Sequence, residues 1–264
     1  MNDIPLSFFI VIAKWILAPL ILFSFVSATI YFFSEPTHQR NWSIEHSRLA
    51  EVLFDSSLKE SQITLKNVRD FDWFSDNKKQ YKEMNFPLKS ITGLKAVVSH
   101  FSFISEVAHV FIIFTLDNKQ EFGVSIEARR EQGEAFSLHG GLLAKFEIIY
   151  LLATPEDLLG VRKKNNEAVH IYPIKASQEK AQELFLLIAN EINLLAKKPA
   201  LYHLFFKNCT NQLVKNVSIL TEEKYPWYFQ TLAPGNTGRI LYELELIDLP
   251  DTGFEDIQAK TLLN

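Results

Sequence analysis

The longest apolar segment of the chain lies at its N-terminal end. Residues 15–33 carry no charged side chain, and only Lys14 interrupts an apolar stretch that reaches back to residue 4. Crossing the hydrocarbon core of a bilayer takes about 20 apolar residues, whereas the apolar core of a signal peptide has roughly 7–15 and ends at a cleavage site of small residues. The apolar run continues beyond Ser27-Ala28, the best cleavage candidate. We therefore expect residues 1–35 to be an uncleaved transmembrane anchor.

Downstream of this segment the hydrophobic positions follow helical and strand-like periods in turn. Ser43 and the residues after it fit a capping box, which predicts an amphipathic helix through Leu53. A second helix is predicted from its N-cap, Ser177, to Lys197. Strands are predicted at 63–70, 88–103, 108–116, 122–129, 147–152 and 169–172, with a hairpin turn at 117–120.

This order of elements predicts an α+β domain built on an antiparallel sheet with packed helices. We assign residues 41–250 to that domain and residues 251–264 to a C-terminal tail. The net charge of −4 and the lack of a basic run exclude a nucleic-acid partner. The 22 phenylalanines indicate a well-filled aromatic core.

Cys209 is the only cysteine among the 264 residues. A single cysteine rules out an intramolecular disulfide and a metal site built from several cysteines, and we expect no metal and no cofactor. A helical pattern begins at Cys209, directly after Asn208. A thiol in the first turn of a helix lies near the positive end of the helix dipole and near unpaired N–H groups, which lower its pKa and favour a nucleophilic thiolate. The alternative is a free cysteine that serves as a small buried hydrophobic residue.

A thiolate nucleophile needs a base, and His109 is the strongest candidate. It is a polar residue inside an otherwise apolar strand, so it must be hydrogen-bonded or functional. On the following strand Ser125, Glu127 and Arg129 share one face. A three-residue hairpin connection would place Glu127 opposite His109, where it would orient the imidazole and stabilise its charged form. A two-residue connection would place Ala128 there instead.

Two alternatives remain open for this pair of strands. Ser125 is a second candidate for the group that orients His109. Glu127 could equally take part in a structural salt bridge with Arg129, Arg130 or Arg69.

Several motifs occur together in one order along the chain. They are Trp42, NVRDF at 67–71, AHVFIIF at 108–114, SIEARRE at 125–131, YP at 172–173, NCT at 208–210 and PG at 234–235. This combination resembles the Lnb N-terminal periplasmic domain, named after a bacterial lipoprotein N-acyltransferase, over roughly residues 41–249. The order of a histidine strand before an Asn-Cys helix start is also similar, more distantly, to the permuted papain-like (NlpC/P60-like) thiol enzymes typified by lecithin–retinol acyltransferase.

The resemblance implies a cysteine-dependent acyl transfer on a membrane lipid or lipoprotein. The implied location is the bacterial inner membrane, with a single pass and the soluble domain facing the periplasm. A papain-like amidase or peptidase of the cell envelope and a non-catalytic envelope binding module are the alternative functions. The candidate residues are the nucleophile Cys209, the base His109, the orienting Glu127, and, for substrate binding or an oxyanion site, Asn208, Ser125 and Arg129.

Overall fold

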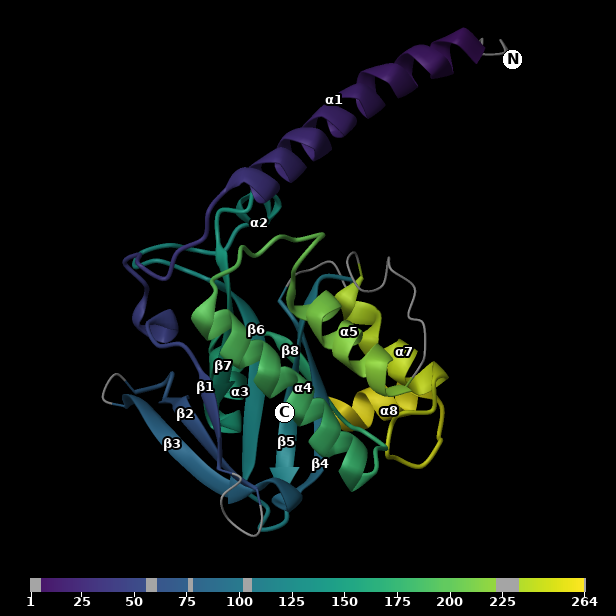
Figure 1. The fold of residues 1–264 in the computed structure, drawn as a ribbon. Helices are drawn as coiled ribbons and strands as arrows, with labels where there is room; N and C mark the ends of the chain where they lie inside the picture. Colours follow the sequence, from purple (N-terminus) through teal and green to yellow (C-terminus); the bar gives the residue numbers. More distant parts are fainter. Residues whose placement is uncertain (1–5, 56–60, 76–77, 102–105, 222–232, 264) are drawn as a thin grey trace.

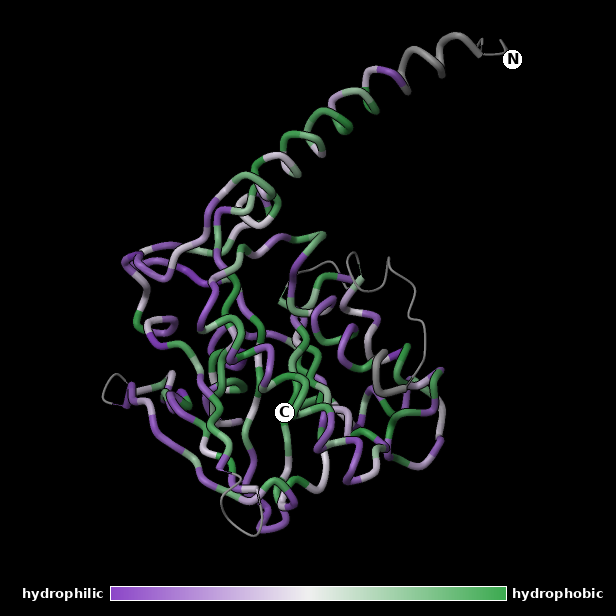
Figure 2. Tube along the Cα trace, in the orientation of Figure 1, coloured by the Kyte–Doolittle hydropathy of each residue, from purple (hydrophilic) through white to green (hydrophobic). Residues whose placement is uncertain are grey.

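The computed structural model describes residues 6–55, 61–75, 78–101, 106–221 and 233–263 (Figure 1). Helix α1 (Leu6–Phe33) extends away from a folded domain that contains the other elements. Its segment Lys14–Phe33 is long and apolar enough to cross a membrane, and Figure 2 shows predominantly hydrophobic residues along it. The helix therefore fits the predicted single-pass anchor, of which residues 1–5 lie outside the described residues.

Among the described residues, eight strands form one mixed sheet in the order β1-β2-β7-β6-β5-β4-β8, and β3 pairs with β2 outside this path. The described strands pair antiparallel except β2 and β7, which run parallel. The predicted α+β class is confirmed, and the predicted antiparallel sheet is corrected to a mixed one at this pair. No hairpin sets the direction of β2 relative to β7, because four strands separate them along the chain. The strands are β1 (Glu51–Asp55), β2 (Gln62–Phe71), β3 (Lys79–Pro87), β4 (Ile91–His100), β5 (Ala108–Leu116), β6 (Glu121–Arg129), β7 (Glu147–Ala153) and β8 (Ala168–Pro173).

Helices cover both faces of the sheet. Helices α4 (Gln178–Lys197) and α5 (Cys209–Thr221) pack on one face, and α3 (Pro155–Lys164) packs on the other (Figure 1). Shorter helices lie at the margins: α2 (Leu138–Leu142), α7 (Thr237–Glu243) and α8 (Phe254–Thr261). The α4 side holds the larger core, where the rings of Phe114, Phe122 and Phe185 lie 5.3 to 5.7 Å apart. Burying one such side chain contributes about 1.5–3 kcal/mol.

The hairpin between β5 and β6 has a three-residue connection. The Leu116 N–H donates to the Gln120 carbonyl at 2.8 Å, and Lys119 takes the left-handed conformation with φ 67°. This is the geometry of a type I turn closed by a residue in the left-handed region. Paired positions run from Thr115 opposite Glu121 to Ile112 opposite Val124. Of the two connections weighed from the sequence, the structure has the one that directs Glu127 toward His109.

The prediction of a helix after Ser43 is wrong. Only a single 3₁₀ turn, Ile44–His46, forms there, and the apolar residues that follow belong to β1. Strand β1 pairs with β2, and the Asn193 side chain of α4 bonds to both the N–H and the carbonyl of Val52, at 2.9 and 2.7 Å. Strand β2 is the next strand along the chain, and Asn193 is 141 positions away from Val52, so strand pairing and this distant contact override the local helix signal.

The predicted strand at 108–116 has the bounds of β5. Four other predicted strands and the helix at 177–197 are present with shifts of one residue at their ends. The predicted strand at 88–103 becomes a 3₁₀ turn, Leu88–Ser90, followed by β4, and residues 102–103 of it lie outside the described part of the chain. Ser177 caps α4 as predicted, because its hydroxyl accepts from the Lys180 N–H. The segment predicted as a C-terminal tail contains α8, whose Phe254 and Ile257 are buried, and the Leu263 N–H donates to Val169 of β8. Residues 254–263 thus pack with the sheet.

Candidate active site

Cys209, His109 and Glu127 meet at the end of the sheet where β5 begins and β6 ends. Cys209 is the first residue of α5, which packs on both strands. All three residues line one cavity of about 1030 Å³, together with residues of α2, α3 and the 204–208 segment. The structure therefore brings together the three residues singled out from the sequence, each from a different element.

Asn208 sets the position of Cys209 by capping α5. The Asn208 Oδ1 accepts from the Asn211 N–H at 2.9 Å, and the Asn211 Oδ1 accepts from the Asn208 N–H at 2.8 Å. The N–H groups of Cys209 and Thr210 have no partner within the helix, because a helix offers no carbonyl to its first residues. The Asn208 amide nitrogen donates to the Leu204 carbonyl. The Asn208 side chain therefore holds the helix start, and Asn208 also lines the cavity.

The imidazole of His109 is held by Ser125 and Glu127 together. Its Nε2 lies 2.7 Å from the Ser125 Oγ and 3.2 Å from the Glu127 Oε1. The Ser125 hydroxyl donates to the same Glu127 oxygen at 2.8 Å. Because that hydroxyl has only one proton, we assign an N–H to Nε2 of His109, which donates to Ser125. The two orienting groups that the sequence left as alternatives act as one network.

Arg162 of α3 is part of this network and was missed from the sequence. Its Nη2 donates to the Glu127 Oε1 at 2.9 Å, and its Nη1 lies 3.8 Å from the Glu167 Oε1. Glu167 in turn accepts from the Ser99 hydroxyl at 2.6 Å. Among the described residues, the arginine paired with Glu127 is therefore Arg162 and none of the three considered from the sequence.

Charges within the cluster shift the pKa values of its members. Burial disfavours the charged form of His109, but the charges of Glu127 and Cys209 outweigh it and raise the pKa of His109 to about 9. Burial alone would raise the pKa of Glu127, and the charges of His109 and Arg162 instead hold it well below its usual value. For the Cys209 thiol, burial is outweighed by the charge of His109 and by hydrogen bonds, so its pKa is lowered. The cluster favours a thiolate–imidazolium pair.

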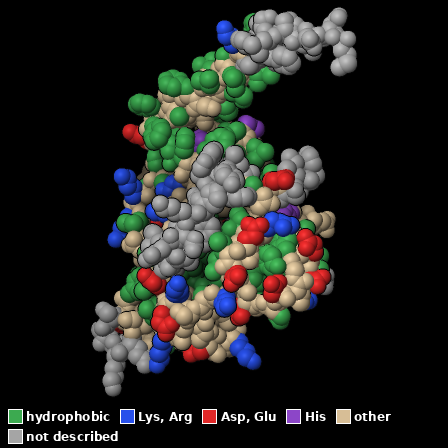
Figure 3. Space-filling view, turned by 90° about the vertical axis from the view of Figure 1, so that its right-hand side faces the viewer, with side chains coloured by type: hydrophobic (Ala, Val, Ile, Leu, Met, Phe, Trp, Pro, Cys, Tyr) green, Lys and Arg blue, Asp and Glu red, His purple; other side chains and the backbone are tan. Residues whose placement is uncertain are grey.

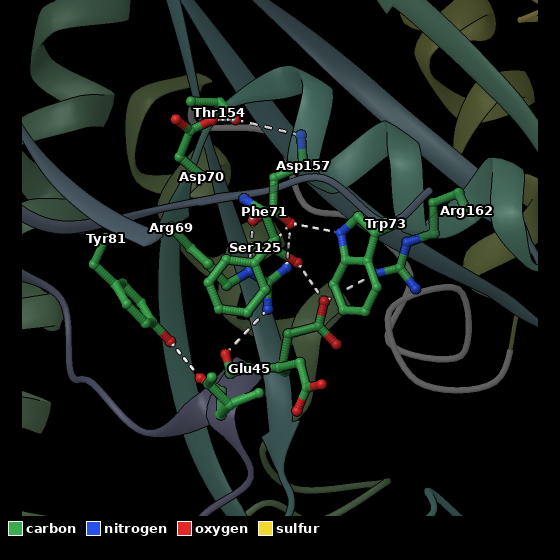
Figure 4. Close-up of polar contacts among 12 residues, drawn as sticks. Glu45, Arg69, Asp70, Phe71, Trp73, Tyr81, Ser125, Thr154, Asp157 and Arg162 are labelled. Atoms are coloured by element: carbon green, nitrogen blue, oxygen red, sulfur yellow. Dashed lines mark hydrogen bonds and ion pairs between the residues drawn. The ribbon is translucent and has the colours of Figure 1, made fainter. Parts of the chain in front are cut away.

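A second buried ion pair fixes α3 on the sheet (Figure 4). Asp157, in the first turn of α3, accepts from the Arg69 Nε and Nη2 at 2.9 and 2.7 Å, from the Phe71 N–H at 2.9 Å and from the Trp73 indole at 3.0 Å. Arg69 belongs to the NVRDF motif. Because α3 also carries Arg162, this pair helps to determine where Arg162 meets Glu127.

Arg129 lies away from the thiol, although it shares a strand face with Glu127. Its Nε donates to the His46 carbonyl at 3.0 Å, its guanidinium lies 4.0 Å from the centroid of the Trp42 ring, and its Nη1 is 3.8 Å from the Glu147 Oε2. The Thr37 N–H donates to Glu147. Arg129 therefore binds the segment that joins α1 to the domain, and the structure does not bring it into the cavity.

The cavity wall has an apolar and a charged part. The apolar part includes Phe101, Phe136, Leu138 and Phe205, and the charged part includes Glu45, Arg130, Glu131 and Glu134. Within the described residues, no group of three or more His, Cys, Asp and Glu side chains is arranged to hold a metal ion.

Comparison with known proteins gives a match to one family description. The sequence model of the Lnb N-terminal periplasmic domain matches residues 77–235, more than half of the chain. No curated protein and no solved structure matches. The matched segment includes His109, Glu127 and Cys209.

Proposed function

Because the chain belongs to the Lnb N-terminal periplasmic domain family, we propose that it is a membrane-anchored thiol enzyme that transfers an acyl group from a lipid or lipoprotein. The family and the apolar helix α1 make it a membrane-associated envelope protein. The convergence of Cys209, His109 and Glu127 on one cavity carries the enzymatic proposal. We place the anchor in the bacterial inner membrane with its domain in the periplasm, since Lys14, the first residue of the span, is the only positive side chain in residues 1–33.

In the first half-reaction the Cys209 thiolate attacks the carbonyl carbon of an acyl ester. The S–C bond forms and the carbonyl π electrons move to oxygen, where the Cys209 N–H at the helix start is the candidate donor. Collapse of this intermediate breaks the ester C–O bond. His109 gives a proton to the leaving alkoxide, the alcohol departs, and the acyl group stays on sulfur as a thioester. Because Nε2 is bonded to Ser125, we assign this proton transfer to Nδ1.

In the second half-reaction an amine or a water molecule attacks the thioester. His109 takes a proton from the attacking group, the C–S bond breaks, and Cys209 leaves as the thiolate. Glu127 holds the imidazole in one orientation and stabilises its charge, and Arg162 holds Glu127. An amine acceptor gives an acyl amide, and water gives a free acid.

The arrangement supports a distant relation to permuted papain-like enzymes, because the base on β5 precedes the nucleophile on α5 along the chain. It also keeps one alternative open. The charged part of the cavity, with Glu45 and Arg130, suits a polar peptide as well as an amine acceptor. An amidase or peptidase of the cell envelope is therefore the second candidate.

Intact-mass analysis tests the proposal directly. The full chain and its Cys209→Ala variant are purified with membrane lipids, and each mass is measured before and after neutral hydroxylamine, which cleaves thioesters. We expect the wild type to gain the mass of an acyl chain that hydroxylamine removes, and the variant to gain none. Identical masses for the two proteins, with no lipid turnover, would overturn acyl transfer. Cys209-dependent cleavage of envelope peptides without an acyl adduct would favour the amidase.

A further inference from the structure

The end of α1 is packed against α2 and the 203–206 segment, which also contribute lining residues to the cavity. The Ser27 hydroxyl donates to the Leu142 carbonyl and lies 2.9 Å from the His203 Nε2. One helical turn later, the Tyr31 ring lies 5.0 Å from the ring of His203 and 5.3 Å from that of Phe206. Figure 3 shows hydrophobic side chains along α1 down to the top of the domain. The domain is thus in contact with the anchor and not only joined to it.

The residues of α1 that contact the domain, Ser27 and Tyr31, lie within the apolar span. Ser27 precedes Phe33, the last residue of the span, by six positions, and at 1.5 Å per residue this is about 9 Å along the helix axis. The whole span Lys14–Phe33 is about 30 Å long at the same rise, which equals the thickness of a hydrocarbon core. Segments beside Ser27 therefore lie at the depth of a lipid leaflet.

We propose that Leu138, Phe205 and Phe206, here called the apolar tip, insert into the bilayer leaflet on the side of the domain. Their exposed fractions are 52%, 42% and 47%, large for hydrophobic side chains that lie next to a membrane span. Interfacial protein segments bury apolar side chains about 5–10 Å into a bilayer, which matches the level of Ser27. The segments 135–146 and 200–211 contain no Asp or Glu and one Lys each. Their composition suits an anionic membrane surface.

Two backbone N–H groups of the apolar tip have partners within the protein, as a lipid environment requires. The N–H groups of Phe205 and Phe206 point at the His203 Nδ1, at 3.1 and 3.4 Å. The backbones of His203 and Lys207 exchange two hydrogen bonds, at 3.0 and 2.9 Å. The His203 side chain is fully buried, and burial lowers its pKa, so it is neutral and its Nε2–H faces Ser27. A neutral buried histidine hides polar groups that would otherwise face lipid.

The apolar tip also leads to the nucleophile. Leu138 and Phe205 line the cavity that contains Cys209, and Phe205 is only a few residues before the start of α5. Insertion of the tip would bring this part of the cavity wall to the level of the acyl chains, so a lipid could enter from the leaflet without crossing water. This route rests on the proposed acyl transfer, whereas the insertion itself does not.

Fluorescence depth measurements test the insertion without any enzymatic readout. Cys209→Ser removes the only cysteine, and a new one is introduced by Phe206→Cys, by Leu138→Cys or by Phe74→Cys as a matched control. Phe74 is 71% exposed, and its neighbour Trp73 bonds to Asp157, which follows the C-terminal end of β7. The segment after α1 contacts the opposite end of β7, where the Thr37 N–H donates to Glu147. Each chain is labelled with an environment-sensitive dye and reconstituted into vesicles of phosphatidylethanolamine and phosphatidylglycerol.

We expect the labels at positions 206 and 138 to be quenched several-fold more by lipids with a nitroxide on the acyl chain than by aqueous iodide. The label at position 74 should show the reverse order. Quenching of both tip labels by iodide to the same extent as the control would overturn the proposal. Phe206→Cys removes the ring contact between Phe206 and Tyr31, so the label at position 138 gives a second measurement that does not depend on that contact. If the labels are lipid-exposed while the intact-mass experiment finds no acyl adduct, the insertion stands and the acyl transfer fails.

Discussion

Helix α3 takes part in two buried arginine–carboxylate pairs that differ in how completely they are satisfied. In the first, Asp157 is fully buried and accepts hydrogen bonds from Arg69, from the Phe71 backbone and from the Trp73 indole. In the second, the Glu127 carboxylate bonds to Arg162 but also shares one oxygen with Ser125 and His109, and its side chain remains 21% exposed beside the cavity.

The difference distinguishes an ion pair that stabilises the fold from one that takes part in a candidate catalytic site. The hydrogen-bond partners of the Asp157 carboxylate described above are a guanidinium, a backbone amide and an indole. The Glu127 carboxylate faces an imidazole that can gain or lose a proton next to a thiol. Buried charges that are saturated with donors stabilise a fold, whereas one that is coupled to a titrating group in a cavity indicates a functional site. The predictions below test this distinction.

Replacing the base should have the largest effect. His109→Gln removes both the proton acceptor and the charge that lowers the pKa of Cys209, and we expect the rate of acyl-thioester formation to fall about 10²–10⁴-fold, the usual contribution of a general acid–base group. Mass spectrometry against time measures this rate. His170→Gln is the matched control, because His170 is also buried on a strand but lies outside the cavity. Equal losses in both variants would show that the effect is structural.

Breaking the saturated pair should reduce mainly the stability of the fold. Arg69→Leu leaves Asp157 as an uncompensated buried charge, and we expect a loss of about 3–5 kcal/mol in the free energy of unfolding. Denaturant unfolding in detergent measures this loss. Arg69 acts on the thiol only through the placement of α3 and Arg162, so the alkylation rate of Cys209 in the folded fraction should fall by less than it does in Glu127→Gln. The double variant Arg69→Leu/Asp157→Leu should be more stable than Arg69→Leu alone. If the double variant is the weaker one, the pair does not act as a unit.

Neutralising the second carboxylate should shift a pH profile. Glu127→Gln removes the charge that raises the pKa of His109 to about 9, so the imidazole loses its proton at lower pH and the Cys209 thiolate loses a cationic neighbour. The pKa of Cys209 then rises toward its usual value, and iodoacetamide alkylation at neutral pH should slow about tenfold, as one pKa unit implies. In the wild type the rate should decline only as the pH falls through the lowered pKa of Cys209. An unchanged profile in the variant would exclude Glu127 from the network.

A change far from both pairs should have the smallest effect. Lys119 holds φ 67°, which glycine adopts without strain. We expect Lys119→Gly to stabilise the fold by about 0.5–1 kcal/mol and to leave Cys209 alkylation unchanged. Asn118→Gly, at a neighbouring turn position without positive φ, should bring no gain. If both variants gained equally, the turn conformation would not be the cause.

The elements predicted well are those with local signals. Ser177 is itself the N-cap of α4. The connection between β5 and β6 is short, so the register of these two strands follows from the length of one turn. Cys209, His109 and Glu127 could be found for this reason. The residues after Ser43 do not by themselves distinguish a helix from a strand. Strand β1 forms because it pairs with β2 and because the Asn193 side chain bonds to Val52.

Arg162 shows a different limit. Helix α3 was missed, although Thr154 accepts from the Asp157 N–H as an N-cap, Pro155 stands at the first helical position and basic residues end the helix. These signals could have located the helix. They could not have predicted the pairing of Arg162 with Glu127, because 35 positions separate the two residues. The placement of α3 on the sheet also depends on Arg69, a residue of another strand. Arg129 has the residue type of a substrate site, and only its contacts with Trp42 and His46 show that it lies outside the cavity.

The amide of Asn193 has a consequence for the outer border of the sheet. Strand β1 is the terminal strand of the sheet path, and such strands present open donors and acceptors to which another polypeptide can add. By bonding to both backbone groups of Val52, the second residue of β1, the Asn193 side chain occupies one such pair of positions as a neighbouring strand would. A side chain from α4 thereby protects the domain against association by strand addition, a protection that matters for chains concentrated in the plane of a membrane.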